Sequence, residues 1–220
     1  MSTKSSKKPI YAFIDASNLF YGGEKSLGWK IDYEKLIRYL RRRYQVKKVF
    51  YYAGIELNKF NYSPLDSEPI NLNELLAHLK KRLKKDRLKK FDIMSISNNI
   101  QRIKFYLRLK EFGYTLKLKP VKIFYEPDGN TVKKANCDVD MTFDLMRLYY
   151  EYSGVLVLSG DGDFAVVLKY LKDKGKSLRI LARGERTARE IRQLAGSDFR
   201  DFNYLREILK FQATKKRGHI

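Results

Sequence analysis

Two short apolar runs, each followed at once by aspartate, constrain the fold of this chain more than any other feature of its sequence. Residues 10–14 (IYAFI) lead directly into Asp15, and residues 154–158 (GVLVL) lead into the acidic turn SGDGD. A continuous apolar run of this length is typical of a strand buried on both faces of a parallel sheet. Each run therefore predicts a central strand with carboxylates at its carboxyl end.

Helical patterns alternate with the predicted strands along the chain. Further strands are predicted at 46–52, 115–125, 178–181 and 199–202, with Pro120 bending or dividing the second of these. Helices are predicted at 32–43, 71–90, 99–112, 138–152, 164–174, 186–194 and 204–211. This alternation predicts an α/β fold whose mostly parallel central sheet of about five strands is flanked by helices.

The length of 220 residues suits one domain with attached segments. A hydrophobic fraction of 44% excludes disorder over most of the chain. The expected organisation is a disordered basic tail at 1–9, a single domain at 10–211 with a basic helical insertion at about 55–102, and a basic tail at 212–220.

The charge balance indicates what the protein binds. Lysine and arginine number 46 against 25 aspartates and glutamates, which gives a net charge of +21. Neutralising phosphates with such a surface releases counterions, so nucleic acid is the expected partner. No apolar stretch approaches the roughly 20 residues that span a bilayer, so we expect no membrane association and a cytoplasmic location. A homodimer is one option for the assembly.

The few cysteines and histidines limit the metal chemistry. One cysteine and two histidines exclude a disulfide framework and a thiolate zinc site within the chain, so any metal must be held by oxygen. Acidic residues gather where the predicted strands end: Asp15, the turn with Asp161 and Asp163, and the helix start CDVDMTFD. Carboxylates converging from separate strands favour Mg²⁺ or Mn²⁺, which can activate water against a phosphodiester.

Each of these acids also has a structural interpretation. Asp15 can end a strand, and Asp138 can cap its helix and complement the helix dipole. Asp144 lies about 120° from Asp138 around an ideal helix of ~3.6 residues per turn, so the two cannot point equally at one ion. Asp140 lies four residues before Asp144, on roughly the same helix face, and is a second-rank candidate. Asn18 and Ser159 are candidates either to support the site or to form turns.

Three motifs together, FIDASNLF, CDVDMTFDLM and VLVLSGDGDFAVVLKYLKDKGK, resemble the NYN family of PIN-like nucleases and its LabA-like branch. The resemblance covers about residues 10–53 and 115–202. It implies a PIN-like three-layer sandwich and divalent-metal-dependent cleavage of RNA, so RNA is expected as the partner in preference to DNA. The implied catalytic set is Asp15, Asn18, Asp138, Asp144, Ser159, Asp161 and Asp163. The expected metal ligands among them are Asp15, Asp138, Asp161 and Asp163.

A basic segment within the insertion is the main candidate for nucleic-acid binding. Residues 80–90 (KKRLKKDRLKK) hold eight basic residues and one acidic residue. They can bind phosphates, form a solvated amphipathic face over leucines, or do both. An anionic membrane surface is a weaker alternative. The candidate nucleic-acid contacts are Lys80, Lys81, Arg82, Lys84, Lys85, Arg87, Lys89, Lys90, Arg183, Arg186 and Tyr21.

These observations predict a metal-dependent ribonuclease, favouring endonucleolytic cleavage, with Mg²⁺ or Mn²⁺ as cofactor. No histidine is placed to act as general base, so the metal is expected to activate the water. The rival is a nucleic-acid-binding or regulatory protein of the same fold without catalysis. A phosphatase or other small-molecule phosphotransfer enzyme explains the charge of +21 less well.

Overall fold

The computed structural model describes residues 8–20, 25–63, 65, 68–85, 87–125 and 131–212. Its strands are β1 (Ile10–Asp15), β2 (Val46–Ile55), β3 (Thr115–Pro120), β4 (Lys122–Tyr125), β5 (Thr131–Lys134), β6 (Gly154–Leu158), β7 (Ser177–Ala182) and β8 (Phe199–Asp201). Its α-helices are α1 (Ala16–Asn18), α2 (Lys25–Leu27), α3 (Tyr33–Tyr44), α4 (Leu72–Lys85), α5 (Lys90–Phe112), α6 (Asp138–Arg147), α7 (Ala165–Asp173), α8 (Arg189–Ala195) and α9 (Arg206–Leu209). Short 3₁₀ turns are η2 (Gly162–Phe164), η3 (Gly184–Arg186), η4 (Gly196–Asp198) and η5 (Phe202–Leu205).

Six strands form one parallel sheet in the order β3-β2-β1-β6-β7-β8. The predicted α/β fold with a parallel central sheet is confirmed, with six strands where about five were expected. The two apolar runs, β1 and β6, are neighbours at the centre, paired from Ile10 with Gly154 to Ile14 with Leu158. Because both strands run in the same direction, the residues that follow them emerge at one edge of the sheet.

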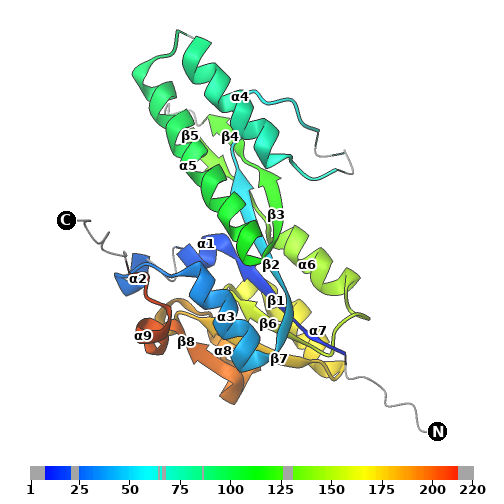
Figure 1. The fold of residues 1–220 in the computed structure, drawn as a ribbon. Coiled ribbons are helices and arrows are strands. Elements are labelled where there is room, and N and C mark those ends of the chain that lie inside the picture. The colour runs from blue at the N-terminus through cyan, green and yellow to red at the C-terminus, as the bar shows by residue number, and fades with distance from the viewer. Residues whose placement is uncertain are drawn as a thin grey trace, which may run out of the picture.

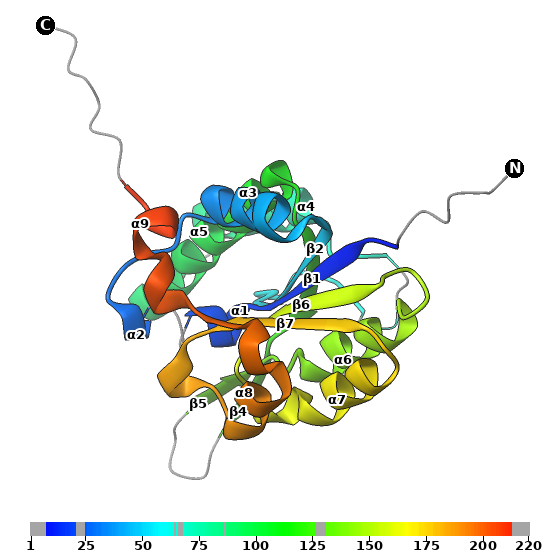
Figure 2. The same ribbon diagram turned by 90° about the horizontal axis from the view of Figure 1, so that it is seen from below.

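Helices cover both faces of this sheet, which gives three layers (Figure 2). On β1, Ala12 and Ile14 face a core shared with α3, α5 and α9, whereas Tyr11 and Phe13 face the core under α6, α7 and α8. The alternation follows from the two-residue repeat of a strand. Burial on both faces is the reason that the run has no polar residue before Asp15.

Helix α3 shows how local sequence signals set the element bounds. The Asp32 carboxylate accepts a hydrogen bond from the Lys35 backbone N–H at 3.0 Å, which caps the helix as predicted. At the other end Gln45 adopts a left-handed backbone conformation with φ 56°. The chain then passes directly into β2 at Val46.

The predicted helix at 71–90 is wrong at its carboxyl end. Helix α4 ends at Lys85, and α5 begins at Lys90, nine residues before the predicted start of 99. Lysine, arginine and leucine all favour helix, so the segment carries no local stop signal, and packing of α4 against α5 decides where the chain turns. Gly113 ends α5 as expected, in a left-handed conformation with φ 96°.

An arm projects from the sheet on the side where β1 passes into α1 (Figure 1). We define the arm as α4, the first half of α5, and the antiparallel pair β4 and β5. β2 runs three residues beyond its predicted end to Ile55, toward the arm. The predicted division of 115–125 occurs at Val121, between β3 and β4, whereas β5 was not predicted.

Several predictions fall outside the described residues. They concern Tyr21 and nearly all of the tails expected at 1–9 and 212–220. The side chain of Lys85 is likewise outside the description. Among the described helices, none has the length and apolar character needed to cross a membrane.

Candidate functional site

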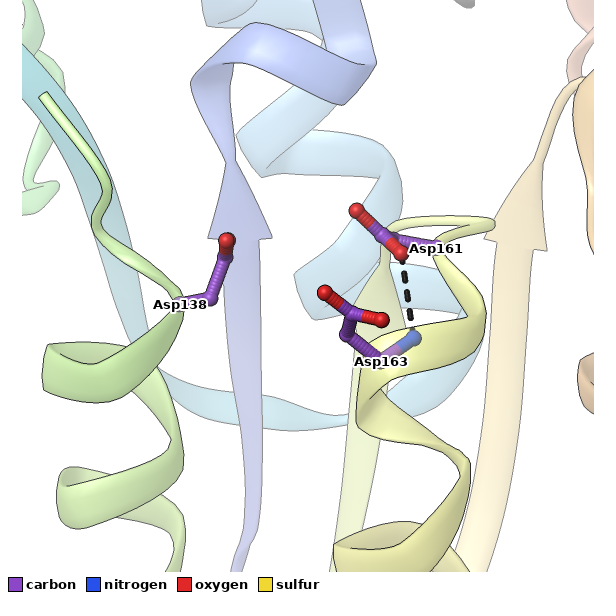
Figure 3. Close-up of side chains that lie close together, drawn as sticks. All are labelled: Asp138, Asp161 and Asp163. Atoms are coloured by element: carbon purple, nitrogen blue, oxygen red, sulfur yellow. Dashed lines mark hydrogen bonds between the residues drawn. The ribbon is translucent and has the colours of Figure 1, made fainter. Parts of the chain in front are cut away.

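Three carboxylates meet at the edge of the sheet where β1 and β6 end. Asp138 is the first residue of α6, and Asp161 and Asp163 belong to the turn that follows β6 (Figure 3). One oxygen from each of the three lies within 4.8 Å of the others. The sequence motifs at 138 and at 161–163 are therefore brought together in space, as predicted from the ends of parallel strands.

The turn after β6 is held in shape by its own side chains. The Asp161 carboxylate accepts a hydrogen bond from the Asp163 backbone N–H at 3.0 Å and caps η2 (Figure 3). A Cβ atom on Gly160 would lie 2.8 Å from the Thr187 Cα atom, so only glycine allows this close approach. The SGDGD motif thus encodes a specific loop as well as two acids.

Asp15 lies at the floor of the site. It ends β1, is only 8% exposed, and accepts hydrogen bonds from the backbone N–H groups of Ser17 at 2.9 Å and Asn18 at 3.2 Å. The Ser159 hydroxyl also donates to it at 3.3 Å. Asp15 is outside the group of three close carboxylates but lines the same cleft as Asp138 and Asp161.

Asn18 and Ser159 join the segments that carry the acids. The Asn18 side-chain oxygen accepts from the Gly160 backbone N–H at 3.1 Å. The Ser159 oxygen, while donating to Asp15, accepts from the Asp161 backbone N–H at 3.2 Å. Both residues therefore position the acidic loops, which agrees with the supporting interpretation of the sequence.

The cleft over these residues has a volume of about 380 Å³. Ser17, Asn136 and Cys137 line it and were not predicted. The Asn136 side chain accepts a hydrogen bond from the Asp138 backbone N–H at 2.9 Å, a capping pattern that the N-x-D spacing could have indicated. Burial and the neighbouring Asp140 raise the pKa of the Cys137 thiol to about 12, so it stays protonated at neutral pH.

The electrostatics of the site favour a bound cation. The pKa of Asp138 is raised by burial and then by the charges of Asp161 and Asp163. The pKa of Asp15 is raised by burial and by Asp138, against the opposing effect of its hydrogen bonds. Within the described part of the chain, no lysine or arginine forms an ion pair with the three clustered carboxylates. Hard oxygen donors in mutual repulsion fit a divalent metal ion.

Asp144 has a different environment from the cluster. It is 4% exposed, accepts a hydrogen bond from the Tyr52 hydroxyl at 3.0 Å, and pairs with Arg147 at 2.7 Å and Lys117 at 3.2 Å. These donors hold the pKa of Asp144 below its ordinary value despite burial. It is not brought together with Asp138, as the angle around the helix indicated.

Lys119 is a cation beside the site that the sequence did not single out. It is at the carboxyl end of β3, and its ammonium group lies 2.6 Å from the Asp140 carboxylate. Its positive charge partly opposes the rise in the pKa values of Asp138 and Cys137, so Lys119 acts on residues that line the cleft. Asp140 therefore holds the Lys119 ammonium group beside the acidic cleft.

Some of the candidate nucleic-acid contacts are exposed, whereas others bind groups within the protein. Lys80, Lys81 and Lys84 on α4 are exposed, as are Arg87, Lys89, Lys90 and Arg186. Arg82 donates to the Asn58 carbonyl at 2.8 Å, and Arg183 pairs with Glu185 at 2.8 Å and Asp201 at 3.3 Å. On α4, Leu79 is buried and Leu83 packs against the core, so this helix combines an inward apolar face with an outward basic one. Leu88, which follows α4, also packs against the core.

Comparison with known families identifies the class. The family model of the NYN domain matches residues 59–203, more than half of the chain, and the chain belongs to the NYN domain family. The matched span includes Asp138, Asp161 and Asp163 and runs through the segment at 55–102 that the sequence suggested was an insertion. Asp15 and Asn18 lie outside it.

Individual relatives agree with this assignment. The chain is 24% identical over 202 residues to Low amplitude and bright protein LabA of Synechococcus elongatus, covering 90% of this chain and 86% of LabA. The LabA-like resemblance is therefore confirmed. The crystal structure of VPA0982, a Vibrio parahaemolyticus protein of unknown function, shares the fold with a TM-score of 0.56 and 18% identity, over 90% of this chain and 94% of that one.

The D15 protein of bacteriophage T5, crystallised with metal ions, is a weaker match. Its TM-score is 0.43 at 12% identity, over 84% of this chain and 59% of that one. This similarity is too weak to support an inference about function.

Proposed function

We propose that this NYN-domain protein is a divalent-metal-dependent nuclease that hydrolyses RNA, preferentially as an endonuclease. The observation that carries the proposal is the meeting of Asp138, Asp161 and Asp163 within 4.8 Å in a chain of net charge +21. Acids that repel one another inside a cationic protein are accounted for by a cation that they share.

The proposed ligands are Asp138, Asp161 and Asp163, with Asp15 below them in the cleft. Mg²⁺ or Mn²⁺ bound there would activate water and offset the negative charge of a phosphodiester. Ser159 and Asn18 fix the two loops, so the carboxylates are held in position before an ion arrives. No cysteine thiolate competes as nucleophile, because the pKa of Cys137 is about 12.

Substrate binding is assigned to the cationic surfaces around the cleft. Lys119 lies beside the acidic cleft, where its positive charge would attract a phosphate, and Asp140 holds its ammonium group in place. The exposed lysines of α4 lie on the arm, which projects from the same side of the sheet as the acidic site (Figure 1). A chain of phosphates leaving the cleft can therefore continue along the arm. RNA is preferred over DNA on the family resemblance.

The test is a cleavage assay with labelled single-stranded and hairpin RNA, and with the same sequences as DNA. Wild type, Asp161→Asn and the control Asp173→Asn are each incubated with Mn²⁺, Mg²⁺ or EDTA. Asp173 is an exposed acid on α7, paired with Lys169, so the control removes an equal charge outside the cluster.

We expect products with wild type and Asp173→Asn only when metal is present, and none with Asp161→Asn. Internal cuts in circular RNA would identify an endonuclease. Bound but uncut RNA under every condition would instead favour the rival, a binding or regulatory protein. Cleavage that persists in Asp161→Asn, purified free of host nuclease, would refute the proposed mechanism.

A further inference from the structure

A second cleft lies at the opposite edge of the sheet from the acidic site. It has a volume of about 500 Å³ and is formed where β1, β2 and β6 begin, from the segments at 8–10, 43–45 and Ser153, together with Arg179, Arg200 and η4. Strand β1 separates the two clefts by five residue steps, or roughly 17 Å at the usual rise of a strand. The cleft is therefore distinct from the carboxylate cluster.

Positive charge dominates this second cleft. Its lining includes Lys8, Arg43, Arg179 and Arg200 against one acid, Asp198, which leaves a net charge of 4 − 1 = +3. Asp198 pairs with Arg179, at 3.7 Å. Among the described residues, no carboxylate pairs with Lys8, Arg43 or Arg200. Cations held together without counter-charges destabilise the folded state, and a bound anion would relieve their repulsion.

The backbone brings these cations together from distant parts of the chain. Gln45 adopts its left-handed conformation at the end of α3, where glycine would fit with less strain, and this turn places Arg43 and Gln45 beside the start of β1. Parallel pairing of β6 with β7 and of β7 with β8 brings Arg179 and Arg200 to the same cleft. Residues distant in the sequence thus form one cationic surface.

The chemistry of the lining selects phosphoryl groups. Three arginines offer planar, forked donors that match phosphate oxygens, and the volume falls within the range of small-molecule sites. The one aromatic ring of the lining, Tyr44, carries the guanidinium groups of Arg43 at 5.7 Å and Arg179 at 5.8 Å from its centroid. The ring therefore holds arginines in place instead of offering its faces to a nucleobase.

We propose that this cleft, lined by Lys8, Arg43, Arg179 and Arg200, binds a terminal or clustered phosphoryl group carrying at least two negative charges. Such a group occurs in free pyrophosphate and at the 5′-phosphorylated end of an oligonucleotide. The proposal does not rest on the nuclease activity, because the two clefts are on opposite edges of the sheet.

Pyrophosphate is the first probe, titrated calorimetrically into the full chain. The buffer contains EDTA, so no metal in the acidic cluster recruits the ligand. The test variant is Arg43→Gln/Arg200→Gln; both side chains are exposed, so we expect the fold to be retained. The control Lys104→Gln/Lys110→Gln removes the same charge from exposed positions on α5 that do not line the cleft. A third variant, Arg43→Lys/Arg200→Lys, keeps the charge and removes the forked donors.

We expect saturable binding by wild type and by the control, and an affinity reduced by about tenfold or more in the test variant, the effect of losing one charge-assisted hydrogen bond. The affinity of Arg43→Lys/Arg200→Lys should lie between that of wild type and that of the test variant. The second probe is a short oligonucleotide with either a 5′-phosphate or a 5′-hydroxyl. Preference for the phosphorylated form, abolished in the test variant, assigns the site to a nucleic-acid end even when pyrophosphate binds weakly.

Two results would overturn the proposal. One is absence of pyrophosphate binding together with equal affinity for both oligonucleotides, which is ordinary attraction to a polyanion. The other is an equal loss of affinity in the control, which would assign binding to the overall charge. Far-ultraviolet circular dichroism and the melting temperature of each variant show that the fold is intact.

Discussion

The side-chain oxygen of Asn18 accepts a hydrogen bond from the backbone N–H of Gly160 at 3.1 Å, although the two residues are 142 positions apart. This hydrogen bond joins the loop after β1 to the loop after β6. The Ser159 hydroxyl also connects Asp15 to the Asp161 backbone. The two loops that carry the acids are therefore held together by hydrogen bonds.

The first prediction follows from that hydrogen bond. Asn18→Ala should lower metal-dependent cleavage about 10- to 100-fold, as removal of a residue that supports metal ligands does. The measurement is initial rate against Mn²⁺ concentration, and most of the decrease should appear as weaker metal binding. Asn203→Ala, at an exposed asparagine outside the site, is the control. Unchanged rates in Asn18→Ala would contradict the supporting role.

The second prediction concerns pH and the repulsion between acids. Because the pKa of Asp138 is raised above its ordinary value of 3.8, the folded state binds that proton more tightly than the unfolded state. The stability that this bound proton contributes is fully present below the pKa of Asp138 in the unfolded state. It is lost as the pH rises through the raised pKa of the folded state. Without metal, Asp138→Asn should therefore melt at a higher temperature than wild type at pH 7, with a difference that shrinks as the pH falls.

Metal should reverse this order at pH 7. Mn²⁺ binds the folded cluster and is expected to raise the melting temperature of wild type, but not that of Asp138→Asn. Thermal unfolding from pH 7 down to pH 4.5, with Mn²⁺ or EDTA, measures both effects. The idea of a shared cation fails if neither the variant nor the metal changes the melting temperature.

The third prediction separates Asp144 from the cluster. Asp144→Asn removes the charge that binds Arg147 and Lys117 and weakens the acceptor for the buried Tyr52 hydroxyl. We expect urea unfolding to show a decrease in stability of about 2 kcal/mol, typical of a hydrogen bond to a charged group. Asp140→Asn, on the same helix with an exposed partner, should lower stability by less than about 1 kcal/mol.

Cleavage distinguishes the two roles of Asp144. If Asp144 is structural, its variant cleaves RNA at a temperature well below its unfolding transition, with unchanged dependence on Mn²⁺. Loss of cleavage with unchanged stability would instead show that Asp144 acts on the metal or the substrate, as the family resemblance implies.

The fourth prediction concerns the arm. Replacing Lys80, Lys81 and Lys84 by glutamine should weaken single-stranded RNA binding and reduce the slope of log affinity against log salt by roughly 0.7 for each phosphate that is no longer neutralised, or about 2 in total. The control replaces by glutamine three exposed lysines, Lys169 and Lys172 on α7 and Lys174 directly after it. An equal change of slope in both triple variants would show that net charge, and not the arm, determines binding.

The sequence alone determined the central strands, the helix cap at Asp32 and the edge of the sheet where the acids collect. These features are local: an apolar run without polar residues must be buried on both faces, and parallel strands end at the same edge. For the same reason the SGDGD turn could be recognised as a carboxylate-bearing loop before its geometry was known. The parallel α/β fold followed from the alternation of strands and helices.

Tertiary structure decided what local patterns leave open. The break between Lys85 and Lys90 depends on the packing of α4 against α5, and β5 is defined by its pairing with β4. The position of Lys119 depends on its ion pair with Asp140 of α6. The angle around the helix already separated Asp144 from Asp138, but its partners Tyr52 and Lys117 come from distant strands and could be identified only in the tertiary structure. The cationic cleft is assembled from residues between 8 and 200, because strand order, which no single segment encodes, sets which side chains share an edge.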